Sequence, residues 1–237
     1  TTCIPTTGTC CGTGTITGCI FNDHNNDCKQ QTGETGICGI QVTCYGTTSD
    51  GKCLLVDCTT DSNGNYKFCN LPSGCYKVIE HDPDTYYDGG QCAGNYGGTC
   101  TDDICSGVVI SGSRTCSGYN FGELCGSDIQ GTVFYDCNKD GKIESNDTGI
   151  AGVKLTLTGT DYLGNAVSLV TYTNAQGQYD FGNLAAGTYT LTETEPTGDV
   201  TTKDTVGTDG GTLSGDKISN IIVHWDTDGT GYNFGEI

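Results

Sequence analysis

A chain of 237 residues with 34% hydrophobic content favours two small domains over one large core. Its 29 acidic and 10 basic residues give a formal net charge of -19, which argues against a nucleic-acid or anionic-membrane partner and favours cations. Seventeen cysteines without a CxxC pair indicate disulfides in an oxidising compartment rather than zinc or iron–sulfur clusters. We therefore expect an extracellular protein, secreted or at the cell surface.

The N-terminal segment, residues 1–15, reads TTCIPTTGTCCGTGT and has three cysteines and no charged side chain. We interpret it as a Cys/Thr-rich tail, because it lies outside the repeat that fills the rest of the chain. An extended Thr-rich segment is suited to complete the sheet of another subunit, so we predict that the tail is an assembly strand. Because seventeen is odd, at least one cysteine has no partner within the chain. The candidates for a bond between subunits are Cys3, Cys10, Cys11 and Cys137.

The rest of the chain contains two copies of one sequence module, and matching positions in the two copies are 113 residues apart. GICGIQV from residue 36 matches GIAGVKL from residue 149, and NGNYKFCNLPSGCYKVIE from residue 63 matches QGQYDFGNLAAGTYTLTE from residue 176. The run YNFGE stands near the end of both copies. We therefore predict two domains, residues 16–126 and residues 127–237.

Short alternating runs such as VKLTLTG, QYDFGNL and TYTLTE predict strands with one buried face and one solvated face. Glycine-rich turns separate these runs, and no stretch has the pattern of an amphipathic helix. About seven such strands in each copy predict a small antiparallel β-sandwich, and hence an all-β chain. Two segments rich in Gly, Asp and Thr, residues 84–113 and 197–220, are expected to be mostly loop.

Each copy has an acidic loop directly after its first hydrophobic strand, and the second copy has the clearer example, DCNKDGKIESND. Acidic or amide side chains stand at loop positions 1, 3, 5 and 12, with glycine at position 6, which is the spacing of a twelve-residue calcium loop. Calcium prefers six to eight oxygen ligands, and this donor set is made of oxygen. The predicted ligands are Asp136, Asn138, Asp140, the carbonyl oxygen of Lys142, and Asp147. An Asx-rich solvated turn is the alternative.

The first copy has the same layout in DHNNDCKQQTGE. The predicted calcium ligands there are Asp23, Asn25, Asp27, the carbonyl oxygen of Lys29, and Glu34. Cys28 replaces the glycine at loop position 6, so we expect a strained turn that a disulfide holds, with Cys38 as one candidate partner. A further set of acids without regular spacing offers additional ligands: Asp209, Asp216, Asp226 and Asp228.

The order of these motifs resembles the SdrD B-like repeats of bacterial surface proteins, which are relatives of the Cna protein B-type domains. The resemblance covers residues 16–237. The resemblance rests on four motifs: GTVFYDCNKDGKIESNDTGIAGV from residue 131, GQYDFGNLAAGTYTLTE from residue 177, DTVGTDGG from residue 204 and the closing GYNFGE. It implies an immunoglobulin-like sandwich that binds calcium and serves as a rigid stalk or spacer in extracellular assemblies.

The Cna relatives also suggest an isopeptide crosslink made from a Lys, an Asn and a catalytic Glu. Glu80 and Glu193 stand in the sequence context of that glutamate, and Asn120 and Asn233 lie in the last strand. The first strands, ITGCIF and IQGTVF, have no Lys where the bond-forming relatives have one. We therefore do not expect the crosslink here.

The cysteines are unevenly placed, because sixteen of the seventeen lie at or before Cys125. Disulfides are therefore expected to staple the first copy and not the second. Cys69 and Cys75 flank a short turn and are predicted to pair across a hairpin. Cys44 with Cys53 or Cys58 is a second predicted pair.

The sequence has no pattern typical of an enzyme. The three histidines, His24, His81 and His224, have no matching Ser or Cys signature, and the paired carboxylates are explained as metal ligands. We therefore predict a non-enzymatic structural protein, calcium-stabilised and disulfide-stapled, that self-associates as a subunit or segment of a fibre, stalk or sheath.

The alternative is a cell-surface adhesin, in which the loops of one module bind a ligand while the other module acts as a spacer. An adhesin would need a concave or aromatic-lined site. Four aromatic residues are possible contributors: Tyr86, Tyr87, Tyr96 and Trp225.

Overall fold

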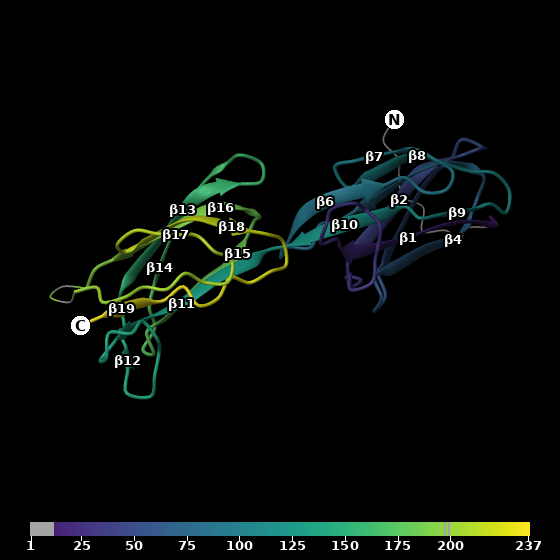
Figure 1. The fold of residues 1–237 in the computed structure, drawn as a ribbon. Helices are drawn as coiled ribbons and strands as arrows, with labels where there is room; N and C mark the ends of the chain where they lie inside the picture. Colours follow the sequence, from purple (N-terminus) through teal and green to yellow (C-terminus); the bar gives the residue numbers. More distant parts are fainter. Residues whose placement is uncertain (1–11, 197, 199) are drawn as a thin grey trace. The chain divides into compact units, whose positions relative to one another are not determined.

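The computed structural model describes residues 12–196, 198 and 200–237, and the chain divides into two compact units between Cys125 and Gly126 (Figure 1). The described residues contain strands and turns and no helix. Each unit has two sheets that enclose one apolar core, so the predicted all-β class with two tandem immunoglobulin-like sandwiches is confirmed.

In the first unit, one sheet has the strand order β4-β1-β10-β6, with β9 also paired to β1, and the other has the order β3-β2-β5-β8-β7. The strands of the first sheet are β1 (Gly14–Asn22), β4 (Asn65–Leu71), β6 (Tyr86–Cys92), β9 (Thr115–Ser117) and β10 (Asn120–Cys125). The strands of the second sheet are β2 (Gln41–Thr48), β3 (Cys53–Thr59), β5 (Gly74–Glu80), β7 (Thr99–Thr101) and β8 (Ile104–Ile110).

The second unit repeats this arrangement with a four-stranded sheet, β12-β11-β15 with β19 paired to β11, and a five-stranded sheet, β14-β13-β16-β18-β17. The strands of the smaller sheet are β11 (Ser127–Tyr135), β12 (Thr148–Gly149), β15 (Gln178–Leu184) and β19 (Phe234–Glu236). The strands of the larger sheet are β13 (Lys154–Asp161), β14 (Ala166–Tyr172), β16 (Gly187–Thr194), β17 (Thr212–Leu213) and β18 (Lys217–Val223).

The first and last strands of each unit run parallel, which departs from the purely antiparallel sandwich expected. Ile20 of β1 stands opposite Phe121 of β10, and Val133 of β11 stands opposite Phe234 of β19. These pairs are related by the 113-residue offset, so the repeat extends to strand register. All four side chains are fully buried in the two cores.

One glycine in each first strand makes this parallel pairing possible. A Cβ added at Gly131 would lie 1.7 Å from the carbonyl oxygen of Tyr232, and one added at Gly18 would lie 1.7 Å from that of Tyr119. Each of these carbonyl oxygens also accepts a hydrogen bond from a buried tyrosine hydroxyl, Tyr179 in the second unit and Tyr66 in the first. The glycines of GCIF and GTVF are therefore fixed by close approach of the backbone.

Of the two segments expected to be mostly loop, residues 84–113 are largely strand, so the prediction is wrong there, while the described part of residues 197–220 is mostly loop as predicted. Residues 84–113 form β6, β7 and β8, and residues 197–220 include β17 and the start of β18. In β8 and β18 the ladder to the neighbouring strand shifts register, and Gly107 and Asn220 have positive φ at the shift. Such a bulge moves the buried side chains by one position and hides the two-residue alternation.

The predicted disulfide between Cys69 and Cys75 is wrong, because both cysteines have free, exposed thiols. Cys69 lies in β4 and Cys75 in β5, which belong to different sheets. The intervening turn therefore crosses the sandwich and does not close a hairpin. The other predicted pair is also wrong, since Cys44 keeps a buried thiol and Cys58 a free one, while Cys53 is disulfide-bonded elsewhere.

The disulfides that the described residues form with one another join Cys28 to Cys92 and Cys100 to Cys105. Both lie in the first unit, and Cys137 of the second unit has a free, exposed thiol. Strand β1 already begins at Gly14. Residues 1–11, including Cys3, Cys10 and Cys11, lie outside the described residues, and so does the prediction that they form an assembly strand.

Candidate metal centres

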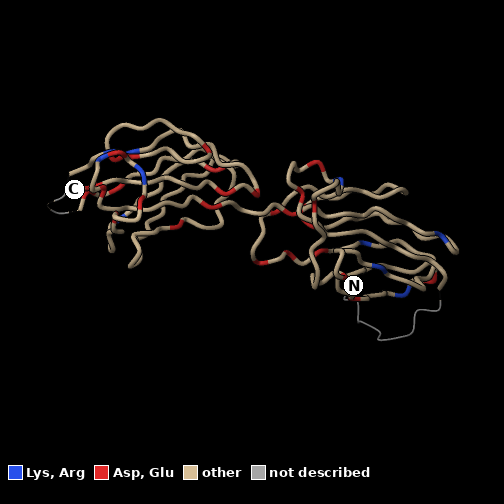
Figure 2. Tube along the Cα trace, turned by 60° about the horizontal axis from the view of Figure 1, so that its bottom comes forward, with Lys and Arg blue, Asp and Glu red and all other residues tan. Residues whose placement is uncertain are grey.

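Acidic residues far outnumber basic ones along both units (Figure 2), and the two predicted calcium loops follow β1 and β11 directly. The first acid of each loop, Asp23 or Asp136, is fully buried although the rest of the loop is mostly exposed. Its backbone N–H donates to the carbonyl oxygen of Glu123 or Glu236 in the last strand of the unit, at 2.7 and 2.8 Å. The root of each loop is therefore fixed to the sandwich.

In the second loop, the carboxylate of Asp136 organises the turn. Oδ1 accepts the N–H of Lys139 at 2.7 Å, and Oδ2 accepts the N–H of Gly141 at 2.9 Å and the hydroxyl of Thr202 at 3.0 Å. Burial works against ionisation of Asp136, but these hydrogen bonds stabilise the carboxylate and hold its pKa below its usual value. The carboxylate is thus kept charged at the base of the loop.

The first loop keeps the bond to loop position 6 with a different residue. Asp23 Oδ2 accepts the N–H of Cys28 at 2.6 Å, where Asp136 accepts that of Gly141. Cys28 has φ +61, close to the +76 of Gly141, although a left-handed backbone costs a non-glycine residue about 1–2 kcal/mol. The expected disulfide at this turn is present, but it joins Cys28 to Cys92 of β6 and not to Cys38, whose thiol is free.

Oxygen atoms of loop positions 1 and 3 converge on one amide in each loop. The N–H of Asp140 lies 3.2 Å from Asp136 Oδ1 and 3.1 Å from Asn138 Oδ1, and the N–H of Asp27 has the equivalent contacts in the first loop at 3.2 and 3.3 Å. Positively polarised N–H groups thus occupy the oxygens that calcium would share. The donor set of each loop is made of oxygen, which is the ligand type that calcium prefers.

The carboxylate of the last acid in each loop is hydrogen-bonded to backbone N–H groups of the same loop. Asp147 accepts the N–H groups of Cys137 and Glu144 at 3.1 and 2.8 Å, and Glu34 accepts the N–H of Gln31 at 2.7 Å. Within the described residues, neither loop brings three carboxylates within 4.8 Å of one another. If the ion is bound, Asp136, Asn138, Asp140, Lys142 and Asp147 would hold it in the second loop and Asp23, Asn25, Asp27, Lys29 and Glu34 in the first.

A cluster of carboxylates lies inside the first sandwich. The sequence did not predict it as a metal site. Oxygens of Glu80, Asp103 and Glu123 lie within 4.8 Å of one another, and the two glutamates are buried, at 3% and 2% exposure. Both carboxylate oxygens of Glu80 have no hydrogen-bond partner. Burial, reinforced by the charges of neighbouring acids, raises the pKa of Glu80 to about 10 and that of Glu123 to about 8.

The second unit has the matching glutamates, Glu193 and Glu236, at 4% and 0% exposure. All four of their carboxylate oxygens are buried without a hydrogen-bond partner. Burial and the charge of Glu236 raise the pKa of Glu193 to about 9, while burial and the charge of Glu195 raise that of Glu236 to about 8. The sequence could have pointed to these buried glutamates, because both recur at the 113-residue offset.

The other predicted acids do not form a centre of their own. Asp209, Asp226 and Asp228 belong to no group of close carboxylates among the described residues. Asp228 Oδ1 accepts the N–H of Asp128, and Asp216 Oδ1 accepts the hydroxyl of Thr201 at 2.6 Å. The asparagines of the isopeptide motif accept backbone N–H groups, Asn120 from Cys19 and Asn233 from Thr132.

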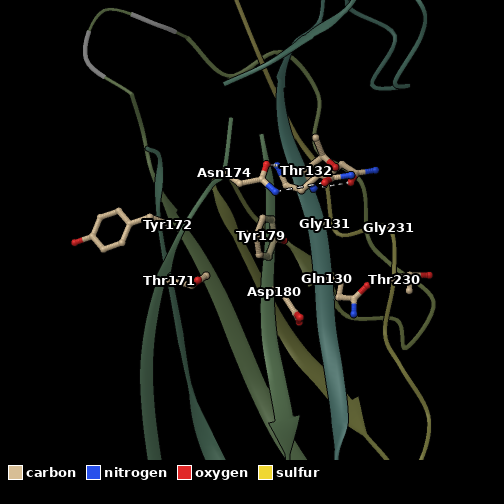
Figure 3. A pocket seen from close by; sticks show the side chains of 12 residues that line it. Gln130, Gly131, Thr132, Thr171, Tyr172, Asn174, Tyr179, Asp180, Thr230 and Gly231 are labelled. Atoms are coloured by element: carbon tan, nitrogen blue, oxygen red, sulfur yellow. Dashed lines mark hydrogen bonds between the residues drawn. The ribbon is translucent and has the colours of Figure 1, made fainter. Parts of the chain in front are cut away.

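Each sandwich has an open hollow beside the glycine of its first strand. In the second unit it has a volume of about 530 Å³, and Figure 3 shows Tyr179 and Asp180 of β15 within it, while Tyr172 extends away from the other labelled side chains. The residues that line the hollow of the first unit correspond, at the 113-residue offset, to residues that line the hollow of the second unit. The hollow is therefore a property of the fold. None of the four aromatic residues proposed for adhesion lines either hollow; Tyr96 lies against Arg114 and Trp225 against Tyr162.

Together, the duplicated sandwich and the acidic loop after its first strand define a tandem-repeat β-sandwich protein. Residues 14–103 and 127–230 match the SdrD B-like domain, and the chain belongs to this family. It is a family of structural surface domains and not of enzymes, and it places the chain outside the cell or at its surface.

Two relatives among the curated proteins illustrate the match. The chain is 33% identical over 198 residues to serine-aspartate repeat-containing protein F of Staphylococcus epidermidis, covering 80% of this chain and 11% of the relative. It is 34% identical over 198 residues to serine-aspartate repeat-containing protein C of Staphylococcus aureus strain N315, covering 81% of this chain and 20% of the relative. The chain therefore spans a fifth or less of the length of these relatives.

Among solved structures, the chain is similar to the shaft pilin SpaA of Lactobacillus rhamnosus GG, with 13% identity, a TM-score of 0.40, and coverage of 94% of this chain and 98% of the pilin. It is also similar to GBS52, the minor pilin of Streptococcus agalactiae, with 13% identity, a TM-score of 0.37, and coverage of 94% and 96%. At these low values neither likeness bears on function. No helix suited to cross a membrane occurs in the part of the chain that the structure describes.

Proposed function

We propose that this chain is a calcium-stabilised, disulfide-stapled segment of an extracellular fibre, stalk or sheath. The proposal rests on the repeated attachment of a calcium-type loop to the last strand of its own sandwich, through Asp23 and Glu123 in the first unit and Asp136 and Glu236 in the second. Calcium, when bound, supplies positive charge that several loop oxygens share at once. An ion held there would therefore fix the loop against the strand and stiffen that end of the unit.

The disulfides support the same mechanical role. Cys28–Cys92 ties the first loop to β6, at a sequence separation of 64 residues. The second loop has Gly141 in place of Cys28, and no disulfide is found at the described residues of that unit. We infer that calcium and disulfides are two means of holding the same turn, with the second unit dependent on calcium alone.

Self-association is part of the proposal. The exposed thiol of Cys137 is available to another chain, and the Cys/Thr-rich tail with Cys3, Cys10 and Cys11 is the proposed assembly strand. Non-reducing electrophoresis and electron microscopy of the full chain, with and without a chelator, test this together with the metal. We expect oligomers or fibres under oxidising conditions with calcium. A chain that remains monomeric there, with an unchanged melting temperature after chelation, would contradict both parts of the proposal.

The alternative is a cell-surface adhesin, and the observation that favours it is the polar hollow of the second unit, with Tyr172 at its edge and 61% exposed. An adhesin would bind an immobilised matrix protein or glycan saturably, and Tyr172→Ala together with Asp180→Ala would weaken that binding. The corresponding change in the first unit, Lys67→Ala, is the matched control. Binding that is insensitive to all three changes would exclude the hollow as the ligand site.

A further inference from the structure

The buried carboxylates of the first unit come from both sheets of the sandwich. Glu80 ends β5 in one sheet, Glu123 lies in β10 of the other, and Asp103 lies in the turn between β7 and β8. Their oxygens lie within 4.8 Å of one another. Three acidic groups thus meet where the two sheets face each other.

Glu80 lacks the partner that a buried carboxylate needs. Removing an unpaired charge from water is strongly unfavourable, so a buried carboxylate requires a hydrogen bond, a proton or a cation. Glu80 is 97% buried and neither of its carboxylate oxygens has a hydrogen-bond partner. The ion pairs formed by the described residues, Lys52 with Asp50 and Lys142 with Asp140, lie elsewhere.

The spacing of the three carboxylates suits a metal ion better than a shared proton. Two carboxylates that share a proton lie within hydrogen-bond distance, and the oxygens of Glu80 have no such contact. Calcium–oxygen distances of 2.3–2.6 Å place two ligand oxygens up to about 5 Å apart, which is consistent with the 4.8 Å limit found here. Three carboxylates also offer six oxygens, the lower end of the calcium range.

Asp103 is held in an unusual backbone for presentation to the two glutamates. Asp102 and Asp103 both have positive φ, at 47° and 59°, in the two-residue turn of the β7–β8 hairpin. Gly, Asn and Asp are the residues that usually fill such positions, because these residues tolerate positive φ. The disulfide Cys100–Cys105 closes this hairpin, and Gln91 Nε2 donates to Asp103 Oδ1 at 3.1 Å. The acid is therefore pre-positioned from two directions.

The second unit contains an internal comparison. Glu193 and Glu236 are again buried without hydrogen-bond partners, but Asp216, the counterpart of Asp103, accepts the hydroxyl of Thr201. Thr201 stands where the first unit has Asp88. The second unit thus keeps the pair of glutamates, but its described acids form no group of three within 4.8 Å, so we expect its affinity for a cation to be lower.

We propose that Glu80, Asp103 and Glu123 bind a divalent cation of the calcium type inside the first sandwich, at a site separate from the acidic loop. The ion bridges β5 and the β7–β8 turn of one sheet to β10 of the other. Its effect is to crosslink the two sheets through their side chains. This site does not depend on ion binding by the loops.

The test counts calcium ions bound to the full, oxidised chain by equilibrium dialysis and native mass spectrometry. Glu80→Gln/Glu123→Gln keeps the shape of both side chains and removes their charge, and we expect it to lose one ion per chain. Asp103→Asn lies on a partly exposed turn that does not form the core, and we expect it to weaken that ion at least about tenfold, because ligand charge sets calcium affinity. The matched change in the second unit, Glu193→Gln/Glu236→Gln, is expected to have a smaller effect.

The loop variant Asp27→Asn/Asp140→Asn separates this site from the proposed loop ions. If the loops fail to bind calcium, this variant leaves the ion count unchanged while Glu80→Gln/Glu123→Gln still lowers it. The proposal is overturned if both Asp103→Asn and Glu80→Gln/Glu123→Gln bind as many ions, with the same affinity, as the unaltered chain. Carboxyl NMR signals that show Glu80 protonated in saturating calcium at neutral pH would likewise overturn it.

Discussion

The backbone N–H of Asp136 donates to the carbonyl oxygen of Glu236 at 2.8 Å, and Asp23 is joined to Glu123 in the same way at 2.7 Å. In each unit this bond connects the first acid of the exposed loop to a glutamate whose side chain is buried in the sandwich. The loop and the buried carboxylates are therefore adjacent along the backbone while using different side chains. Loss of calcium at either place is expected to loosen the same end of the unit.

Replacing Asp136 tests whether the loop is anchored as the structure indicates. Asp136→Ala removes the acceptor of three backbone N–H groups and of the Thr202 hydroxyl. We expect a loss of about 2–4 kcal/mol in the free energy of unfolding, because buried donors lose a charged partner. The measurement is chemical denaturation of the full chain, followed separately for each transition, with and without calcium.

The control for Asp136→Ala is Asp161→Ala. Asp161 also accepts N–H groups in an Asx turn, from Leu163 and Asn165, but it lies in an exposed hairpin turn with no calcium-type spacing. Its loss should be smaller and should not depend on calcium. Equal calcium dependence of the two variants would mean that the loop at Asp136 is only a solvated turn.

The loops and the fold class were readable from the sequence because their signals are local. Alternation over a few residues marks a strand, and the acids of one calcium-type loop lie within twelve positions. Glu80, Asp103 and Glu123 are brought together only by the pairing of β5 with β8 and by the packing of the two sheets. No spacing in the chain expresses that proximity, so the sequence associated Glu80 only with a strand and with the isopeptide motif, and not with Asp103 or Glu123.

The disulfide pairing also could not be predicted from the sequence, because it depends on contacts between sheets and loops. Cys69 and Cys75 are close in sequence and were predicted to pair, yet their strands lie in different sheets. Cys28 pairs with Cys92 because the first loop folds back over β6, a contact that the sequence does not indicate. A turn that links sheets and a turn that closes a hairpin have the same Gly/Pro/Ser composition, so composition alone does not distinguish them.

The disulfide at Cys28 is predicted to offset a strained backbone. Removing it with Cys28→Ser/Cys92→Ser should cost about 3–4 kcal/mol, given the length of the loop it closes. Cys28→Gly/Cys92→Ser also lacks the disulfide but allows the left-handed conformation at position 28 without strain. We therefore expect it to be more stable than the serine variant by about 1 kcal/mol, as measured by denaturation with calcium present.

Cys100→Ser/Cys105→Ser is the comparison for loop length, because this disulfide spans only five residues. Its removal is expected to cost less, since a short loop restricts the unfolded chain less. If Cys28→Gly/Cys92→Ser is no more stable than Cys28→Ser/Cys92→Ser, the strain at Cys28 is not what the disulfide compensates.

The buried glutamates predict that the metal-free chain becomes less stable to unfolding as the pH rises. Glu80 and Glu123 have folded pKa values of about 10 and about 8, against an ordinary value of 4.5, because of burial and the facing acids Asp103, Asp82 and Asp88. Well below pH 4.5, both glutamates are protonated in the folded and in the unfolded chain. As the pH rises above that value, the unfolded chain releases protons that the folded chain retains, so stability falls by about 1.4 kcal/mol per pH unit for each proton.

The measurement is denaturation in excess chelator at pH 5.5 and pH 8. The unaltered chain should be less stable at pH 8, and Glu80→Gln/Glu123→Gln should show a weaker dependence in its first unit. Added calcium should remove the loss at pH 8, because the ion replaces the protons. Glu144→Gln, an exposed glutamate of the second loop, is the control and should leave the dependence unchanged. A chelated chain that gains stability between pH 5.5 and pH 8 would rule out the raised pKa values.

The glycine of each first strand gives the sharpest prediction about the fold. In Gly131→Ala the added Cβ would lie 1.7 Å from the carbonyl oxygen of Tyr232, a backbone atom fixed by the hydroxyl of Tyr179. The parallel pairing of β11 with β19 must then open, and we expect a loss above about 4 kcal/mol, the range of the most severe single changes. Gly164→Ala is the control, because that turn glycine has open space around its Cβ position and positive φ, so only about 1 kcal/mol of strain is expected. Hydrogen exchange of the amides in β11 and β19 reports the pairing directly, and unchanged protection in Gly131→Ala would show that the last strand does not depend on this close approach.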